Sequence, residues 1–314
     1  MIPDIDFSNL NPDELVRVAH DFGFFYLVNH GVDLSILDEA RRFFMLPAEE
    51  KQALHIDNSA HFRGYSEMKN SRDWREQIHF GQELPAITGA DYTRLQGPNL
   101  WASSLGESWQ AHLLDYMQAI GRVGHTLLAA LARGLNLPED TFEANIDEPD
   151  YLLMKLIYYH PQPTQQSRRM GVAPHCDWSL ITFLLQDNTG GLQAQTRTGD
   201  WLEVTPREGT FAVNLGELVE IITHGYLRAT PHRVLNRSAE KSRLSIPVFV
   251  NPPLNTLVKS VEMSLKRADT YSEDEHVHRV SQPDKTYDPF CFGESEWQRK
   301  GLGRWCYRPE CLGD

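Results

Sequence analysis

Apolar and polar residues recur with a helical period along the first third of the chain. Asn11 followed by Pro12 provides a cap and a first-turn proline, so a helix is expected to begin there and to stop at Gly23. The next segment, "FFYLVNHG", predicts a short buried strand ended by Gly31, and a second helix is expected from Ser35. Helices and strands therefore alternate in this part of the sequence.

The longest helical pattern begins near Ser104. Ser104 and Glu107 have the spacing of a capping box, and apolar residues then recur at helical intervals over 109–131. Gly134 marks the end of the pattern. The pattern predicts a helix roughly 45 Å long, which is enough to brace a whole sheet.

After residue 150 the pattern changes to short β-rich runs separated by Gly, Asn, Asp and Pro. The runs are "YLLMKLIYY", "SLITFLLQ", "GGLQAQT", "WLEVTP", "TFAVNL", "HRVLN" and "RLSIPVFV". Such regular short strands are typical of a β-sandwich, a barrel or a jelly roll. We expect one domain, with a mostly helical part over 1–149, a β core over 150–253 and a partly helical closing segment over 254–314.

Composition excludes several classes of partner. A chain of 314 residues with 41% hydrophobic and 23% charged residues is ordinary for a soluble globular enzyme. Its net charge of −13 opposes binding to nucleic acid or to an anionic membrane. The sequence shows neither a secretory signal nor a long apolar span, and its four cysteines form no CxxC pair. We expect a cytoplasmic protein with reduced thiols, as a monomer or a weak homo-oligomer.

The stretch "GVAPHCDWSLITFLLQD" places His175 and Asp177 two residues apart in an apolar run. If the run is a strand, both side chains project from one face, and a metal ion would offset the cost of burying them. About two His-x-acid triplets are expected by chance from this composition. The other one, His55-Ile56-Asp57, has no strand pattern around it and indicates a solvated helix end.

A third metal ligand is expected from a later strand. His232, in "GYLRATPHRVLN", follows turn residues and begins a β-type run. Two imidazoles and one carboxylate on one face of an ion form the facial triad of non-haem Fe(II) oxygenases. A lone histidine in such a position is more commonly a hydrogen-bonded core residue, so His232 gains its significance only beside the other two.

The run "RLSIPVFV" repeats the i, i+2 arrangement with Arg243 and Ser245. Strand alternation puts these two on one face and Leu244 on the other. A guanidinium on an inward face requires an anion, and no acid lies nearby in the sequence. The alternatives are a diffusible carboxylate or a salt bridge to a remote acid.

Many segments in the same order resemble the 2-oxoglutarate/Fe(II)-dependent dioxygenases, specifically their isopenicillin N synthase-like branch. The resemblance covers nearly the whole chain and is carried by "IPDIDFS", "DFGFFYLVNHG", "FFMLPAEEK", "RGYS", "GPNLW", "PHCDWSLITFLLQD", "GGLQAQ", "NLGELVEIITHGYLRATPHRV" and "RLSIPVF". It implies a double-stranded β-helix, or jelly roll, buttressed by N-terminal helices. It also implies that Fe(II), 2-oxoglutarate and O2 are used to oxidise a small molecule, with formation of succinate and CO2.

The resemblance assigns roles to particular residues. The family's metal triad falls on His175, Asp177 and His232, with the first two on one strand. Its carboxylate-binding pair falls on Arg243 and Ser245. A tyrosine that often touches the cosubstrate falls on Tyr159. The chain departs from the family where Ile157, His160 and His224 replace the usual residues.

Hydroxylation or desaturation is the expected outcome, with three rivals. An oxidase that takes O2 without 2-oxoglutarate would have the same motifs. A zinc hydrolase also suits two histidines and a carboxylate, but no HExxH-like general base is present. A binding protein without activity would not need three ligands. Side chains that could line the substrate entrance, or equally serve as loop or core structure, are Arg63, Tyr65, Glu76, Asn99 and Phe249.

Overall fold

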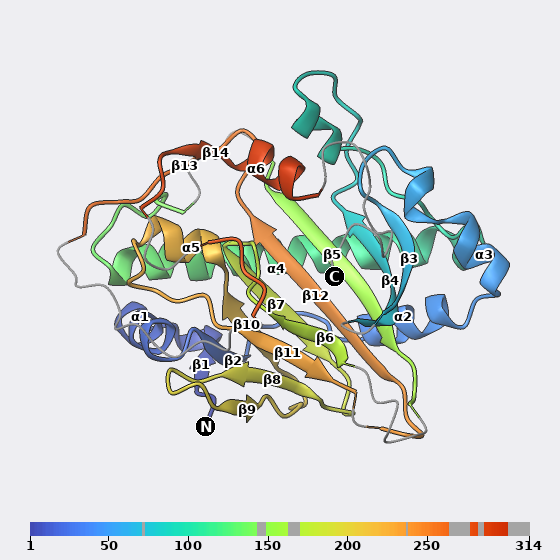
Figure 1. Ribbon diagram of the computed structural model, residues 1–314, viewed down its shortest axis with the longest axis horizontal. Helices are drawn as coiled ribbons and strands as arrows, with labels where there is room; N and C mark the ends of the chain where they lie inside the picture. Colours follow the sequence, from blue (N-terminus) through green and yellow to red (C-terminus); the bar gives the residue numbers. More distant parts are fainter. Residues whose placement is uncertain are drawn as a thin grey trace.

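The computed structural model describes residues 1–70, 73–142, 149–162, 170–236, 238–263, 277–281 and 286–300. Its strands form a large and a small sheet that face one another, together with a short hairpin-like pair (Figure 1). The large sheet has the order β1-β2-β10-β7-β12-β5-β4-β3 and contains β1 (Asp4–Asp6), β2 (Phe24–Val28), β3 (Gly64–Lys69), β4 (Trp74–Gly81), β5 (Tyr151–Tyr159), β7 (Ile181–Gln186), β10 (Phe211–Leu215) and β12 (Arg243–Asn251). The small sheet has the order β6-β11-β8-β9 and contains β6 (Met170–His175), β8 (Leu192–Gln195), β9 (Trp201–Glu203) and β11 (His232–Leu235).

A hydrophobic core lies between the two sheets. Phe24, Ile157 and Tyr159 from the large sheet pack with Leu192 and Val234 from the small sheet. These residues alternate along their strands with residues that face away, as expected for strands with two different environments. The inner faces of the two sheets therefore form the space in which a site can be enclosed.

A long helix covers the outer face of the large sheet. This helix, α4 (Gly106–Gly134), runs behind the sheet in Figure 1. Gly121 and Gly124 on α4 allow close packing, because a side chain there would touch Leu152 on β5 and Val250 on β12. The expected length and end of the helix are confirmed. The expected capping box is wrong, because Leu105 is the cap and the hydroxyl of Ser104 donates to the Glu50 carboxylate.

The N-terminal part holds helices and also completes the large sheet. Its helices are α1 (Pro12–Asp21), α2 (Ile36–Phe44) and α3 (Ala48–Ala53), with short 3-10 helices η1 (Phe7–Asn9), η2 (Ile56–Asn58), η3 (Asp91–Leu95) and η4 (Ser103–Leu105). The expected cap of α1 is confirmed, since the side chain of Asn11 accepts from the backbone amides of Asp13 and Glu14. Residues 1–149 also supply β1 to β4 to the large sheet, where β2 pairs with β10 and β4 pairs with β5 of the second half.

The closing segment packs across one end of the sheets. It contains β13 (Leu257–Val258), β14 (Phe290–Cys291) and α6 (Phe292–Arg299), and a further helix, α5 (Glu217–Ile222), lies before β11. Phe290 stacks on Trp178, and Phe292 and Trp297 are buried. Trp305 lies outside the described residues. Closure of this segment on substrate binding stays a prediction.

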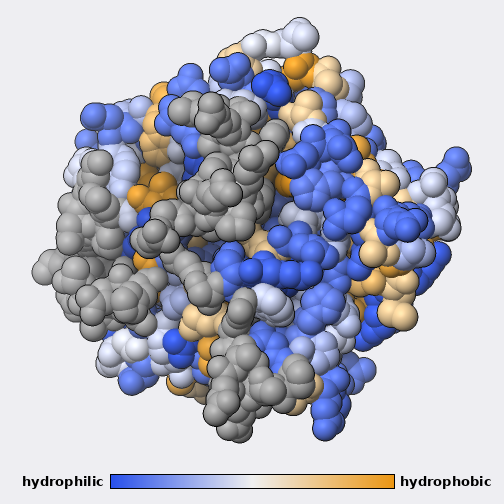
Figure 2. All heavy atoms as spheres, turned by 45° about the vertical axis from the view of Figure 1, so that its right-hand side comes forward, coloured by the Kyte–Doolittle hydropathy of each residue, from blue (hydrophilic) through white to orange (hydrophobic). Residues whose placement is uncertain are grey.

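Hydrophilic side chains cover most of the described surface in the face shown in Figure 2, and hydrophobic ones form small separate groups. None of the helices in the described part of the chain is long and apolar enough to cross a membrane.

Candidate metal centre and carboxylate site

Two histidines of the expected triad meet across the small sheet. His175 ends β6 and His232 begins β11, and the two are direct partners in the antiparallel pairing of these strands. Asp177 is not on a strand, because β6 ends at His175 and β7 begins only at Ile181. The expectation that His175 and Asp177 share a strand is therefore wrong. A turn, rather than strand alternation, brings the aspartate back toward the histidines.

The buried turn is held by residues from the large sheet and from α5. The side-chain amide of Asn214 on β10 donates to Asp177 Oδ2 at 2.9 Å. The backbone amide of Glu217 donates to the carbonyl oxygen of Asp177 at 2.8 Å. These contacts leave Asp177 Oδ1 to face the imidazoles.

Both imidazoles direct the same nitrogen at that carboxylate. His175 Nδ1 lies 2.9 Å from the carbonyl oxygen of Ala173, and His232 Nδ1 lies 3.1 Å from that of Thr230. Because a carbonyl only accepts, these contacts place the ring proton on Nδ1 and leave Nε2 with a free lone pair. The Nε2 atoms of His175 and His232 lie 3.5 Å and 3.6 Å from Asp177 Oδ1.

The donor set fits a divalent metal ion. Ligand atoms bound at about 2.1 Å lie roughly 3 Å apart when they are neighbours around an ion. The observed separations are close to this value, and the ligand atoms of all three residues lie within 4.8 Å of one another. Among the described residues these three form the one such group of histidine, cysteine and acidic side chains.

The protonation states also suit metal binding. Burial lowers the pKa of His232 to about 4, so its imidazole is neutral near pH 7. Burial by itself would raise the pKa of Asp177, but the two histidines and the Asn214 amide hold it well below its usual value. The site thus offers a carboxylate and a neutral imidazole without the loss of a proton.

The second His-x-acid triplet has a different environment. His55 precedes the short helix η2, and its ring accepts a hydrogen bond from the backbone amide of Asp57. The Asp57 side chain is 64% exposed, and no third ligand joins the pair within the described residues. The expectation of a solvated helix end is confirmed.

The guanidinium of Arg243 is buried against neutral partners. It donates to Ser245 Oγ at 2.9 Å and to Gln186 Oε1 at 3.0 Å, and it lies 4.9 Å from the ring centre of Tyr159. Its Nε makes no hydrogen bond to any described residue. No acid pairs with this charge in the described part of the chain, although Arg243 is only 3% exposed. The remote salt bridge is therefore absent there, and a carboxylate from solution would complete the group.

The departures from the family pattern have separate consequences. Ile157, paired with Ser245, packs in the core between the sheets. His160, which follows β5, points its Nε2 at Glu76 Oε1 at 3.0 Å. His224 has a φ of +51°, the backbone region that a glycine or asparagine would adopt at lower cost.

The candidates for the substrate entrance separate into two groups. Glu76 and Tyr65 are hydrogen-bonded to each other, and Glu76 binds the Lys51 ammonium away from the triad. Asn99 holds the backbone of Gly81 with two hydrogen bonds. These three are therefore structural. Arg63 lines a cavity, and Phe249 faces the space between the sheets.

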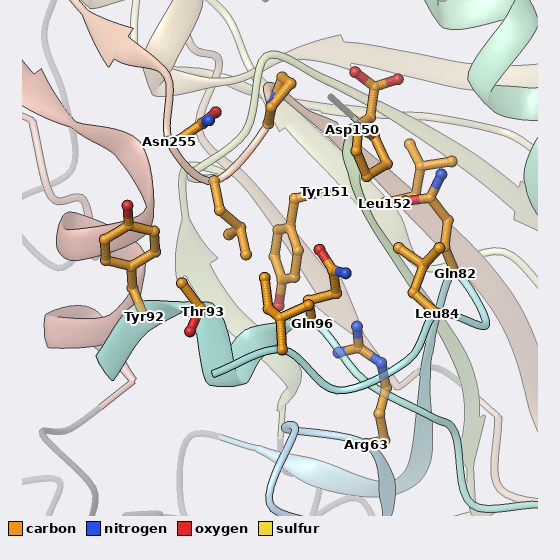
Figure 3. A pocket seen from close by; sticks show the side chains of 14 residues that line it. Arg63, Gln82, Leu84, Tyr92, Thr93, Gln96, Asp150, Tyr151, Leu152 and Asn255 are labelled. Carbon is orange, nitrogen blue, oxygen red and sulfur yellow. The ribbon is translucent and has the colours of Figure 1, made fainter. Parts of the chain in front are cut away.

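Arg63 lines a cavity of about 200 Å³ at the start of β5. Figure 3 shows Arg63 and Tyr151 pointing toward one another from opposite sides of this cavity. The Arg63 guanidinium lies 5.8 Å from the ring centre of Tyr151 and donates to the carbonyl oxygen of Leu95. Since Tyr159 lies at the other end of β5, this cavity is separate from the carboxylate group at Arg243.

Two polar residues of interest were not singled out from the sequence. Asn214 supports Asp177 of the candidate triad, and Lys155 lies half-buried in the middle of β5. Each is a single polar residue in an apolar run, "FAVNL" and "YLLMKLIYY", and this interruption is the signal that identifies them.

Known proteins match the chain over nearly its whole length. A family model described as the 2OG-Fe(II) oxygenase superfamily matches residues 151–252, and one described as non-haem dioxygenase in morphine synthesis N-terminal matches 2–104. A 2-oxoglutarate-dependent dioxygenase of Dothideomycetidae sp. is 30% identical over 306 residues, which cover 92% of this chain and 81% of that protein. A 1-aminocyclopropane-1-carboxylate oxidase of Dictyostelium discoideum is 26% identical over 292 residues, which cover 79% of this chain and 78% of that protein.

The fold is shared with solved structures. A Neurospora crassa protein solved in complex with alpha-KG and thymine has a TM-score of 0.75 at 21% identity, with 95% of this chain and 96% of that chain covered. The expected fold class, mainly β with α and built on a double-stranded β-helix, is confirmed.

Proposed function

Because this chain belongs to the 2-oxoglutarate/Fe(II)-dependent oxygenase superfamily, whose members are oxidoreductases that use Fe(II), 2-oxoglutarate and O2, we propose that His175, Asp177 and His232 bind its iron. The buried carboxylate and the two Nε2 atoms that face it support this assignment. Bound iron supplies the activation of O2 in this family. The chain supplies orientation, through the carbonyl groups that fix both imidazoles and the amide that fixes Asp177.

Arg243 and Ser245 bind the far carboxylate of 2-oxoglutarate. The observation that carries this assignment is a buried guanidinium whose described partners are all neutral. A carboxylate there would receive the fork of Arg243 and the hydroxyl of Ser245 together. Tyr159, whose ring lies against the guanidinium, closes one side of this place and keeps water away from it.

The substrate is a small molecule, and hydroxylation or desaturation is the outcome that we propose. In this reaction 2-oxoglutarate loses CO2 and becomes succinate while O2 is consumed. Within the superfamily we propose that the protein belongs to the isopenicillin N synthase-like branch, has a jelly-roll core and works in the cytoplasm. Its formal charge of −13 supports the absence of nucleic-acid and anionic-membrane partners. We propose a monomer or a weak homo-oligomer.

An oxidase that does not use 2-oxoglutarate is the second candidate. The similarity to a 1-aminocyclopropane-1-carboxylate oxidase favours it, because that protein is named as an oxidase. In such an enzyme Arg243 and Ser245 would hold the carboxylate of the primary substrate instead. The position and partners of Arg243 suit either carboxylate.

The two candidates differ in what 2-oxoglutarate does. Fe(II) and then 2-oxoglutarate are added to the protein without O2, and the weak visible charge-transfer band of the chelate is recorded. After O2 is admitted, succinate and CO2 are measured. We expect the band and succinate. A protein that shows neither is not a 2-oxoglutarate oxygenase, and one that consumes O2 and forms product without succinate is an oxidase.

A further inference from the structure

We propose that the primary substrate carries a carboxylate group and that Lys155 binds it. This inference depends on the function proposed above, which assigns sites for iron and 2-oxoglutarate. It adds the chemical class of the primary substrate. Lys155 has no role in the candidate metal centre or in the group around Arg243, and it lies half-buried on β5.

Lys155 lies on the inner face of the large sheet, in the middle of β5. Residues two apart on a strand share a face, so Lys155 faces the same side as Ile157 and Leu153. Ile157 pairs with Ser245 of the carboxylate group, and Leu153 pairs with Phe249. Lys155 therefore faces the space between the sheets, about 13 Å along the strand from Tyr159, whose ring lies beside the proposed site of 2-oxoglutarate.

The Lys155 ammonium has an aromatic contact and no acid. Its Nζ lies 5.0 Å from the ring centre of Phe249, in a cation–π contact. No hydrogen bond or ion pair joins Nζ to any residue in the described ranges. A half-buried ammonium that turns inward beside other cations, with no anion to balance it, is an unusual arrangement for a purely structural lysine.

Further positive charge surrounds this ammonium. Burial, followed by the charges of Arg75, Lys300 and Arg299, lowers the pKa of Lys155 to about 7, while Asp177 acts in the opposite direction. The acids nearest to the other cations are already paired, because Asp73 binds Arg75. Glu296 likewise binds both Arg299 and Lys300.

This local positive charge contrasts with the negative net charge of the whole chain. The protein carries a net charge of −13, yet a cation of β4 and two cations at the end of α6 act on Lys155. A carboxylate bound there would pair with Lys155 and offset the mutual repulsion. The Phe249 ring beside it provides an apolar wall for the rest of the substrate.

The test compares acids with their uncharged amides. Wild type with Fe(II) and saturating 2-oxoglutarate, kept free of O2, is titrated with phenylacetate, cinnamate and salicylate and with the matching primary amides. Binding is read from the shift of the charge-transfer band. We expect at least one acid to bind about tenfold or more tightly than its amide, as a charge-assisted hydrogen bond implies.

Lys155→Met removes the charge and keeps the volume. We expect the preference for acid over amide to fall to within about twofold while the band itself is retained and Tm is no lower than that of wild type. Lys69→Met is the matched control, since Lys69 is half exposed and paired with Glu67, and it should keep the full preference.

Each contrary result has its own meaning. If no acid shifts the band, if acids and amides bind equally, or if Lys155→Met keeps the preference, the inference is overturned. An acid that abolishes the band has displaced 2-oxoglutarate at Arg243, which also overturns it. A protein that forms no band refutes the proposed function and, with it, this inference.

Discussion

The metal-binding candidates and the other His-x-acid triplet differ at the level of single contacts. His175 and His232 each use Nδ1 for a backbone carbonyl two residues earlier and direct Nε2 at Asp177. In the other triplet the His55 ring accepts a backbone hydrogen bond through Nδ1, and the aspartate faces solvent. The same residue pattern therefore has two outcomes, and the matched pair provides an experimental contrast.

Asp177→Ala is expected to abolish turnover and to weaken Fe(II) binding by at least tenfold without unfolding the protein. The side chain removed is a ligand, and its loss leaves two neutral imidazoles that bind the ion less well. Anaerobic Fe(II) titration, succinate formation and circular dichroism measure these effects. His55→Ala should bind Fe(II) as wild type does. Full activity of Asp177→Ala would refute the assignment.

Arg243→Ala is expected to raise the 2-oxoglutarate concentration required for half-maximal succinate formation by about one to two orders of magnitude. Arg243→Lys should recover only part of this loss, because an ammonium lacks the planar fork. Fe(II) binding should survive both changes, since Arg243 is not a ligand. If the loss instead appears only in the requirement for the primary substrate, the oxidase alternative is favoured.

At the scale of elements, one buried carboxylate joins three segments at the edge of the large sheet. Glu76 on β4 accepts from Lys51 on α3 and from Tyr65 on β3, each at 2.6 Å, and His160 after β5 lies 3.0 Å away. Burial opposes ionisation of Glu76, but these partners together lower its pKa from 4.5 to about 2. The carboxylate therefore holds α3 against the edge of the sheet formed by β3 and β4.

This network predicts a loss of stability in acid. Because the folded pKa lies below the unfolded value of 4.5, the contribution is complete above about pH 5 and is lost as pH falls toward 2. Glu76→Gln should lower the free energy of unfolding at pH 7 by about 3 kcal/mol at most. Urea denaturation at pH 7 and at pH 3 measures this, and the difference from wild type should shrink at pH 3. Glu14→Gln, on the exposed side of α1, is the control and should change little at either pH.

At the scale of the whole molecule, the closing segment is held over α5 by two buried acids. The Glu217 carboxylate accepts from the backbone amides of Val280 and Ser281, and Glu220 pairs with Arg279. The neighbouring backbone of His278 is hydrogen-bonded to Pro174 and Cys176, on either side of His175 of the candidate triad. The segment thus connects α5 to the small sheet at the candidate metal centre.

Glu217→Gln is expected to make the closing segment several-fold more sensitive to limited proteolysis, because an amide accepts less well from two backbone donors. Cleavage sites are mapped by mass spectrometry, and cleavage in residues 1–149 should be unchanged. Adding Fe(II) and 2-oxoglutarate without O2 should slow cleavage of the wild-type segment if it closes over the site. Equal cleavage of both proteins would show that this contact does not hold the segment.

Local spacing alone determined much of this protein. The cap at Asn11, the end of α4 at Gly134 and the strand runs after residue 150 depend on neighbours a few residues away, so periodicity and turn chemistry predict them. The pairs His175 with Asp177 and Arg243 with Ser245 were proposed from residue types at short spacing, whereas His232 was added from a later β-type run. Strand alternation also correctly placed Arg243 and Ser245 on one face.

Only the tertiary structure decided which distant residues meet. Asp177 lies in a turn held by Asn214 and Glu217, and Lys155 is reached by the charges of Arg75 and Lys300. Alternation along a strand assigns a side chain to one face or the other, but it contains no information on which strands lie beside it. Sheet order and register supply that information, because they bring together segments that are far apart in the sequence and thereby set the charge and burial at each point.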